Sequence, residues 1–182
     1  MPDLNQQSTY NDQLIKGATD FAKTLPSTGV GRFSNIPATV RSSNIPATTP
    51  SSLKNLGKIS TNYGESTRFE KFHPALDIAN AEGTNISSFS SGVVSSVQTP
   101  QQSGGFGNSL IITDDQNRQW RYSHLSQSYV RTGERVNQGS TIGSMGNTGN
   151  VYSTTGGSGS HLDLRIFDTA KKYYLNPLSV IS

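Results

Sequence analysis

Three histidines occur in the chain, and each stands in a short context that could contribute to one metal site: His73, His124 and His161. His73 lies four residues before Asp77, and His161 lies two residues before Asp163. Neutral imidazoles and carboxylates that converge on one point form the usual ligand set of a zinc-type site. A single histidine is more often structural, so this prediction rests on the whole set.

Composition narrows the ligand chemistry and the fold class. The chain has no cysteine, which excludes disulfides and thiolate ligands, so a metal would be held by His and Asp. Its 182 residues allow one domain with an extension. With 31% hydrophobic residues and 18 glycines, a turn-rich β domain is favoured over a helical one. A net charge of +3 without a Lys/Arg run argues against nucleic acid as the main partner.

The first 52 residues differ from the remainder. Residues 1–25 contain a predicted short amphipathic helix, whose apolar face would hold Leu14, Ala18, Phe21 and Leu25. It is either a frayed surface helix or a docking helix for a larger assembly. Residues 26–52 are rich in Ser, Thr, Pro and Asn and repeat SNIPAT at 34–39 and 43–48. Two short copies cannot build a solenoid, so we predict an extended linker or arm.

Residues 53–182 show short alternating segments punctuated by glycine, which predict a β domain. In the segment SHLDLRIF, residues Leu162, Leu164 and Ile166 alternate with His161, Asp163 and Arg165. Residues i and i+2 of a strand share a face. We therefore expect His161 and Asp163 to project into the same site.

The stretch from about Tyr63 to Pro177 resembles the lysostaphin-like (LytM-type) zinc metallopeptidases. The matching segments, in family order, are FHPALDIANAEGTNISSFSSGVV, GGFGNSLIITD, WRYSHLS, GERVNQGSTIGSMGNTG and GSHLDLRI. The resemblance implies a mainly β fold, with an antiparallel lysostaphin-like sheet that carries a groove. It also implies a metal-dependent endopeptidase that cleaves peptide bonds of bacterial peptidoglycan.

The resemblance also assigns roles to residues. It implies that His73, Asp77 and Asp163 bind one zinc ion, and that His124 and His161 are catalytic beside the bound water. Around them, Tyr122, Asn108 and Phe106 are candidates for substrate contact. A structural role in hairpin packing is the alternative for these residues, and the same alternative holds for Trp120 and Arg165.

Two positions depart from the family pattern. Asp163 stands where the family has the second His of its H-L-H motif, and Ala75 replaces a central Gly. A carboxylate binds zinc at roughly 2.0–2.2 Å, as an imidazole does, so we expect metal to bind. A second carboxylate makes the metal a weaker Lewis acid and favours oxygen-preferring ions. We therefore expect reduced activity or activity shifted to higher pH, with manganese as a possible competitor. Ala75 should be accommodated if its φ stays negative.

The biological context allows several hypotheses. The N-terminal residues lack the basic and apolar segments of a signal peptide, and no run is long enough to span a membrane. A virion-associated lysin at a phage tail tip fits, with residues 1–52 contacting tail or injection-assembly proteins. A phage lysis enzyme released through a membrane pore or a bacterial enzyme exported by another route would fit as well. The alternative is a catalytically weak or inactive peptidase-like module that has a structural or wall-binding role in a tail or injection assembly.

Overall fold

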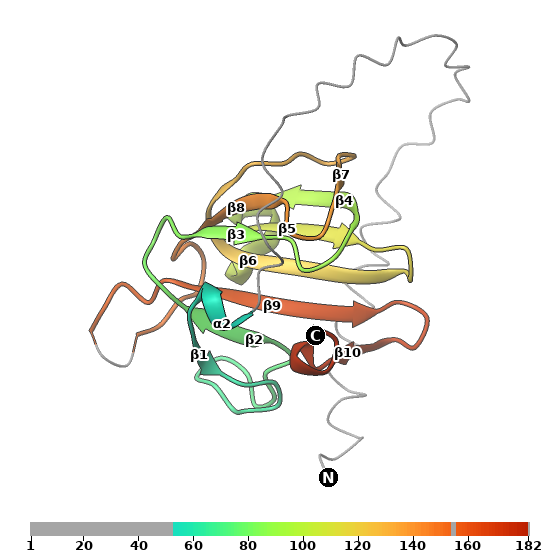
Figure 1. Ribbon diagram of the computed structural model, residues 1–182. Coiled ribbons are helices and arrows are strands. Elements are labelled where there is room, and N and C mark those ends of the chain that lie inside the picture. The colour runs from blue at the N-terminus through green and yellow to red at the C-terminus, as the bar shows by residue number, and fades with distance from the viewer. Residues whose placement is uncertain (1–52, 154–155, 182) are drawn as a thin grey trace, which may run out of the picture. The chain divides into compact units, whose positions relative to one another are not determined.

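The computed structural model describes residues 53–153 and 156–181, in which strands dominate (Figure 1). The helix predicted within residues 1–25 and the arm predicted at 26–52 lie outside the described residues. None of the described helices is long and apolar enough to cross a lipid bilayer.

One ten-stranded sheet organises the described part of the chain. Its strands are β1 Lys58–Thr61, β2 Leu76–Ala79, β3 Asn85–Ser87, β4 Gly92–Gln98, β5 Asn108–Thr113, β6 Arg118–Ser128, β7 Arg135–Val136, β8 Thr141–Met145, β9 His161–Asp168 and β10 Tyr173–Leu175. The helical elements are short: α2 Leu53–Leu56, α3 Pro100–Ser103, and the 3-10 turns η1 Gly104–Phe106 and η2 Pro177–Ser179. The prediction of a mainly β, antiparallel fold is confirmed.

The strand order places three chemically important strands side by side. The main path runs β1-β2-β9-β6-β5-β4-β7, with β10 paired to β9, and β8 paired to both β3 and β6. Strand β9 therefore lies between β2 and β6 (Figure 1). Asp163 of β9 is in register with Asp77 on one side and with Ser123 on the other. Because register partners share a face, residues far apart in sequence meet on one surface of the sheet.

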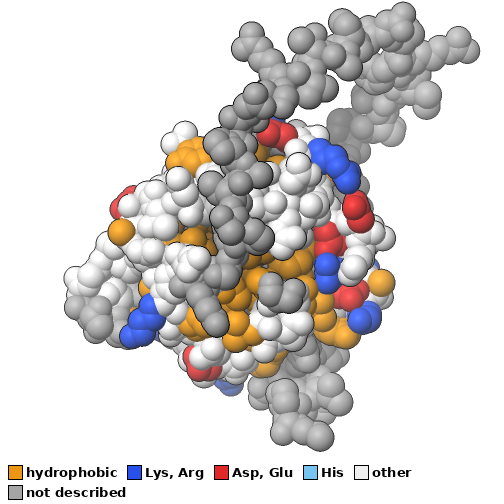
Figure 2. Space-filling model, in the orientation of Figure 1, with side chains coloured by type: hydrophobic (Ala, Val, Ile, Leu, Met, Phe, Trp, Pro, Cys, Tyr) orange, Lys and Arg blue, Asp and Glu red, His pale blue; other side chains and the backbone are white. Residues whose placement is uncertain are grey.

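Alternation along β9 separates the core from this surface. Leu162, Leu164 and Ile166 are fully buried in the hydrophobic cluster, and burial of each such side chain contributes about 1.5–3 kcal/mol. Their neighbours Asp163 and Arg165 point to the opposite face, as the sequence predicts. On the face seen in Figure 2, charged side chains of both signs lie scattered near the edge of the molecule.

Candidate metal centre and active site

The three predicted ligands converge at the face of the sheet on which Asp77 and Asp163 lie. One ligand atom from each of His73, Asp77 and Asp163 lies within 4.8 Å of the others. Nε2 of His73 is 3.0 Å from Oδ1 of Asp77, and all three residues are buried. Ligand atoms bonded to one zinc at about 2.0–2.2 Å lie at most about 4.4 Å apart. The set therefore fits a zinc-type ion with at most a small side-chain adjustment.

The donors fit a cation, and His73 must release a proton to bind it. Burial disfavours the His73 imidazolium, but hydrogen bonds with Asp77 and Glu70 outweigh burial and raise the pKa of His73 to about 9. Burial likewise opposes ionisation of Asp163, but the neighbouring Arg165 lowers its pKa to about 2. Asp163 is thus an ionised carboxylate at neutral pH.

The hydroxyl of Ser123, its register partner, is buried without a hydrogen-bond partner among the described residues.

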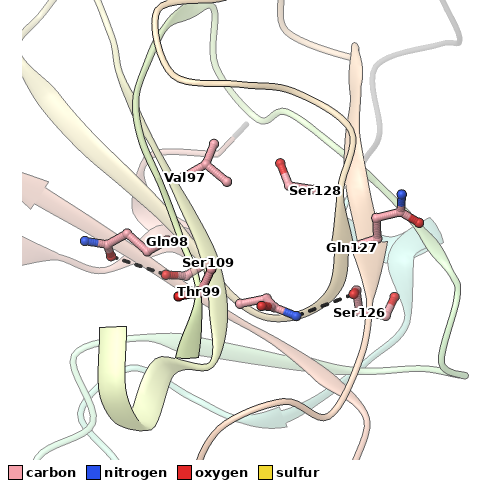
Figure 3. Close-up of a pocket in the computed structure, with 8 residues that line it drawn as sticks. Val97, Gln98, Thr99, Ser109, Ser126, Gln127 and Ser128 are labelled. Carbon is pink, nitrogen blue, oxygen red and sulfur yellow. Dashed lines mark hydrogen bonds between the residues drawn. The ribbon is translucent and has the colours of Figure 1, made fainter. Parts of the chain in front are cut away.

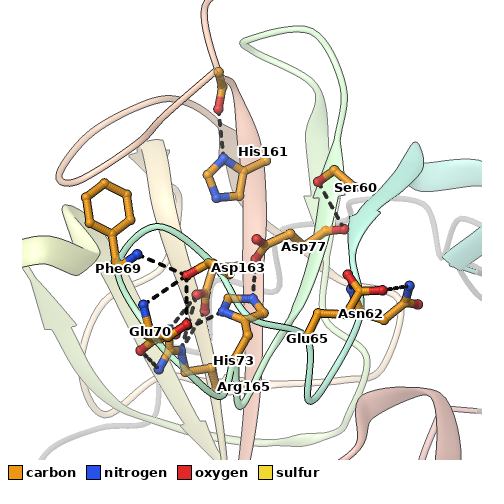
Figure 4. A network of polar contacts seen from close by, with 12 residues as sticks. Ser60, Asn62, Glu65, Phe69, Glu70, His73, Asp77, His161, Asp163 and Arg165 are labelled. Atoms are coloured by element: carbon orange, nitrogen blue, oxygen red, sulfur yellow. Dashed lines mark hydrogen bonds and ion pairs between the residues drawn. The ribbon is translucent and has the colours of Figure 1, made fainter. Parts of the chain in front are cut away.

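A polar network orients the first ligand from behind (Figure 4). Oε2 of Glu70 lies 2.9 Å from Nδ1 of His73. A carboxylate at this distance accepts the Nδ1–H, which directs Nε2 of the ring toward Asp77. No sequence motif marks Glu70, and its only signal in the sequence is an acidic residue three positions before His73.

The two remaining histidines form a pair. The ring centroids of His124 and His161 are 4.6 Å apart, and the ring planes are inclined by 46°. Nδ1 of His124 donates to the Thr148 carbonyl oxygen at 2.8 Å, and Nδ1 of His161 donates to the Gly159 carbonyl oxygen at 2.7 Å. A carbonyl can only accept, so each neutral ring carries its proton on Nδ1 and keeps Nε2 as a base.

The backbone of β6 changes direction at His124. This residue has a φ of +61°, a left-handed conformation that costs a non-glycine residue about 1–3 kcal/mol. The β6–β8 register also shifts between Leu125 and Gln127. The side chains of Tyr122 and Leu125 enter the core, whereas His124 contacts His161. Sequence spacing alone gave no signal for this conformation.

The loop of residues 104–107, which is rich in glycine, supports His124 through Thr148. The backbone N–H of Asn108 donates to Oγ1 of Thr148 at 2.9 Å, and Oγ1 donates to the Leu125 carbonyl oxygen at 2.9 Å. Gly107 has a φ of +65°, and a Cβ built on it would overlap the Thr148 carbonyl oxygen. A glycine is therefore required where the two loops meet.

The candidates for substrate contact lie in different environments. Tyr122 is fully buried, and its hydroxyl accepts the backbone N–H of Phe89 at 2.9 Å, so its contacts are with the core. Phe106 is half-buried beneath the guanidinium groups of Arg121 and Arg165, at 4.5 and 4.7 Å from the ring centroid. Substrate contact by Phe106 and Asn108 stays a prediction.

A pocket of about 260 Å³ adjoins Asn108. It is lined by Val97, Gln98, Thr99, Asn108, Ser109, Ser126, Gln127 and Ser128 (Figure 3). The Asn108 amide donates to the Leu125 carbonyl oxygen at 3.2 Å, so part of this side chain is used within the protein. No charged residue lines the pocket, which separates it chemically from the ligand cluster.

Trp120 and Ala75 are buried within the domain. The Trp120 Nε1–H donates to Asp114 at 2.8 Å within the core. Ala75 is fully buried and is not among the described residues with positive φ. The replacement of glycine at this position is therefore accommodated as expected.

Comparison with known proteins decides the family. The family model described as "Peptidase family M23" matches residues 71–177, which is more than half of the chain and includes all five predicted ligand and catalytic residues. The chain belongs to peptidase family M23.

Relatives of this M23 chain include an endolysin and a peptidoglycan DD-endopeptidase. Endolysin 2638A of Staphylococcus phage 2638A is 33% identical over 102 residues, which are 55% of this chain and 20% of the endolysin. The peptidoglycan DD-endopeptidase ShyC of Vibrio cholerae is 37% identical over 81 residues, 44% of this chain and 18% of ShyC. The M23 chain thus spans about one fifth of the length of these curated relatives.

Among solved structures, the antimicrobial peptidase lysostaphin from Staphylococcus simulans has the same fold as this M23 chain. The TM-score is 0.60 at 25% identity, with 72% of this chain and 51% of the lysostaphin chain covered. The expected lysostaphin-like fold is thereby confirmed.

Proposed function

We propose that this M23 chain is a zinc-dependent endopeptidase that cleaves peptide cross-links of bacterial peptidoglycan. The observation that carries the proposal is the combination of the His73, Asp77 and Asp163 cluster with the adjacent His124 and His161 pair on one sheet face. The phage endolysin and DD-endopeptidase relatives support the substrate class.

The residues divide the chemistry between them. His73, Asp77 and Asp163 would hold the metal, which when bound polarises the attacking water and the scissile carbonyl. Nε2 of His124 or His161 takes the proton of the water. The protonated ring can then donate to the developing oxyanion or to the departing amine.

The electrostatics suit a basic histidine. Burial lowers the pKa of His124 more than the nearby Asp163 raises it, so the ring is neutral at pH 7. A neutral ring with Nδ1 already donating to Thr148 is oriented to accept a proton at Nε2. His124 is therefore a candidate for the general base.

The test is hydrolysis of purified peptidoglycan by metal-loaded protein, with released peptides identified by mass spectrometry. His161→Ala and Asp163→Ala should each lose activity, and Asp163→Ala should also bind zinc more weakly. Exposed Tyr129, outside both clusters, provides the control Tyr129→Ala, which should retain activity. Metal binding without cleavage across several wall types would instead favour a structural or wall-binding module.

The biological setting of the proposed enzyme is a phage tail tip, where residues 1–52 contact tail or injection-assembly proteins. The endolysin relative supports a phage context. Mass spectrometry of purified virions is the test: the protein should be present in intact particles, and its presence only in the lysate would indicate a soluble lysin instead.

A further inference from the structure

Arg165 holds the unusual third ligand, Asp163, through Nε and one terminal nitrogen of its guanidinium. Nε of Arg165 lies 3.0 Å from Oδ1 of Asp163, and a terminal nitrogen lies 2.8 Å from Oδ2. The two side chains are 5% and 4% exposed. A buried bidentate pair fixes the plane of the carboxylate as well as its charge.

The same guanidinium also contacts Glu70, which in turn contacts the first ligand, His73. Its two terminal nitrogens lie 3.0 and 3.1 Å from Oε1 and Oε2 of Glu70. Glu70 in turn accepts from Nδ1 of His73 at 2.9 Å. A continuous chain of contacts therefore connects Asp163, Arg165, Glu70 and His73 behind the site (Figure 4).

Asp163 and His73, at the two ends of this series of contacts, can still bind a metal ion. A carboxylate has about four lone-pair sites, and the three close contacts from Arg165 approach Asp163 from one side. Phe106 packs over the Arg165 guanidinium at 4.7 Å and covers it from solvent. The guanidinium is thus confined between two carboxylates and an aromatic ring.

We propose that Arg165 and Glu70 are positioning residues that set Asp163 and His73 as metal ligands, an inference that rests on the proposed metal-dependent function. Asp163 is shorter than the histidine that the family resemblance implies at this position, so its carboxylate needs an external partner to hold it toward the ion. Arg165 supplies that partner, and Glu70 couples it to the tautomer of His73.

The test is zinc affinity of the full chain, measured by competition with a chromophoric chelator without substrate. Arg165→Met should weaken zinc binding by roughly 10- to 100-fold, as loss of an outer ligand partner does elsewhere. Arg165→Lys keeps the charge but not the fork and should recover only part of the affinity. Glu70→Gln keeps the shape and should weaken binding, with an altered cobalt absorption spectrum.

Arg121 provides the matched control. It lies in register with Arg165 on the neighbouring strand and over the same Phe106 ring, but its side chain donates to Oε1 of Gln98 rather than to Asp163. Arg121→Met should change zinc affinity by less than about threefold. In an Asp163→Ala background, Arg165→Met should add little further loss, because coupled residues are not additive.

Parent-like or tighter zinc binding by Arg165→Met, or full additivity in the Asp163→Ala background, would overturn the proposal. Melting curves of the metal-free proteins check folding, and Glu70→Gln and Arg165→Lys serve if Arg165→Met does not fold. If Arg165→Met cleaves peptidoglycan normally and binds zinc as tightly as the parent, only the positioning role is rejected. If the zinc affinities change as predicted but no variant or parent cleaves peptidoglycan, only the endopeptidase function is rejected.

Discussion

Nδ1 of His124 lies 2.8 Å from the carbonyl oxygen of Thr148, so a loop remote in sequence fixes the orientation of the ring. Gly107 packs against that same carbonyl. Gly107→Ala should push Thr148 away, and misplacement of a catalytic group by about 1 Å can cost about 100-fold in rate. The measurement is peptidoglycan cleavage per mole of bound zinc.

Gly104 is the control for backbone strain. It has a φ of +61°, close to that of Gly107, but a Cβ there would meet nothing within 4 Å. Gly104→Ala should therefore lose some stability and keep most of the activity. Equal activities for the two alanine variants would contradict the role assigned to the Thr148 contact.

Zinc affinity should depend on pH through His73. Its pKa is raised to about 9 in the metal-free protein, so the protonated form is favoured below that pH and competes with the metal. Apparent affinity should rise by about tenfold per pH unit up to about pH 9, with about one proton released. Calorimetry in buffers of different ionisation enthalpy measures that proton. Affinity that is flat between about pH 6 and 8 would show that His73 is not the titrating ligand.

Asp163→His would create the ligand that the family resemblance implies, yet it should destabilise this protein. Arg165 would lose its Asp163 partner and retain Glu70, and removal of one member of a buried pair costs about 3 kcal/mol. Adding Arg165→Gln to Asp163→His should recover part of that loss. Denaturant unfolding of the metal-free proteins measures both effects. An Asp163→His variant as stable as the parent would contradict the prediction.

Asp114 should stabilise the fold without affecting the site. Its carboxylate accepts from Trp120 Nε1 at 2.8 Å and from Arg118 Nε at 2.7 Å. Asp114→Ala should lower the free energy of unfolding by about 2–3 kcal/mol, because a buried donor loses its charged acceptor. Asp115→Ala, at an exposed residue, should change it by less than about 0.5 kcal/mol. Zinc affinity of both folded variants should match the parent.

The pH dependence of the Asp114 effect follows from its pKa. Burial opposes ionisation, but the hydrogen bonds from Trp120 and Arg118 prevail and lower the pKa of Asp114. A lowered folded-state pKa gives stability that is present above the unfolded value, about 3.9, and is lost as the pH falls through the folded value. The stability difference between parent and Asp114→Ala should therefore shrink in acid. A difference that grows below about pH 4 would contradict the assignment.

Residue types and local alternation determined much of this protein. The two-residue period of β9 separates Leu162 and Leu164 from Asp163, because successive strand residues face opposite sides of a sheet. The absence of cysteine likewise limited the ligands to His and Asp. The predicted ligand set needed no long-range information beyond the family resemblance.

Only the tertiary structure decided the surroundings of those residues. Glu70 and Arg165 are 95 positions apart, and their ion pair depends on the β2–β9 pairing and on the loop that precedes β2. The left-handed backbone at His124 depends on strand irregularity and on Thr148. Such contacts are set by register and loop packing, which have no periodic signature in sequence, because non-local pairing is specified by the whole core rather than by adjacent residues.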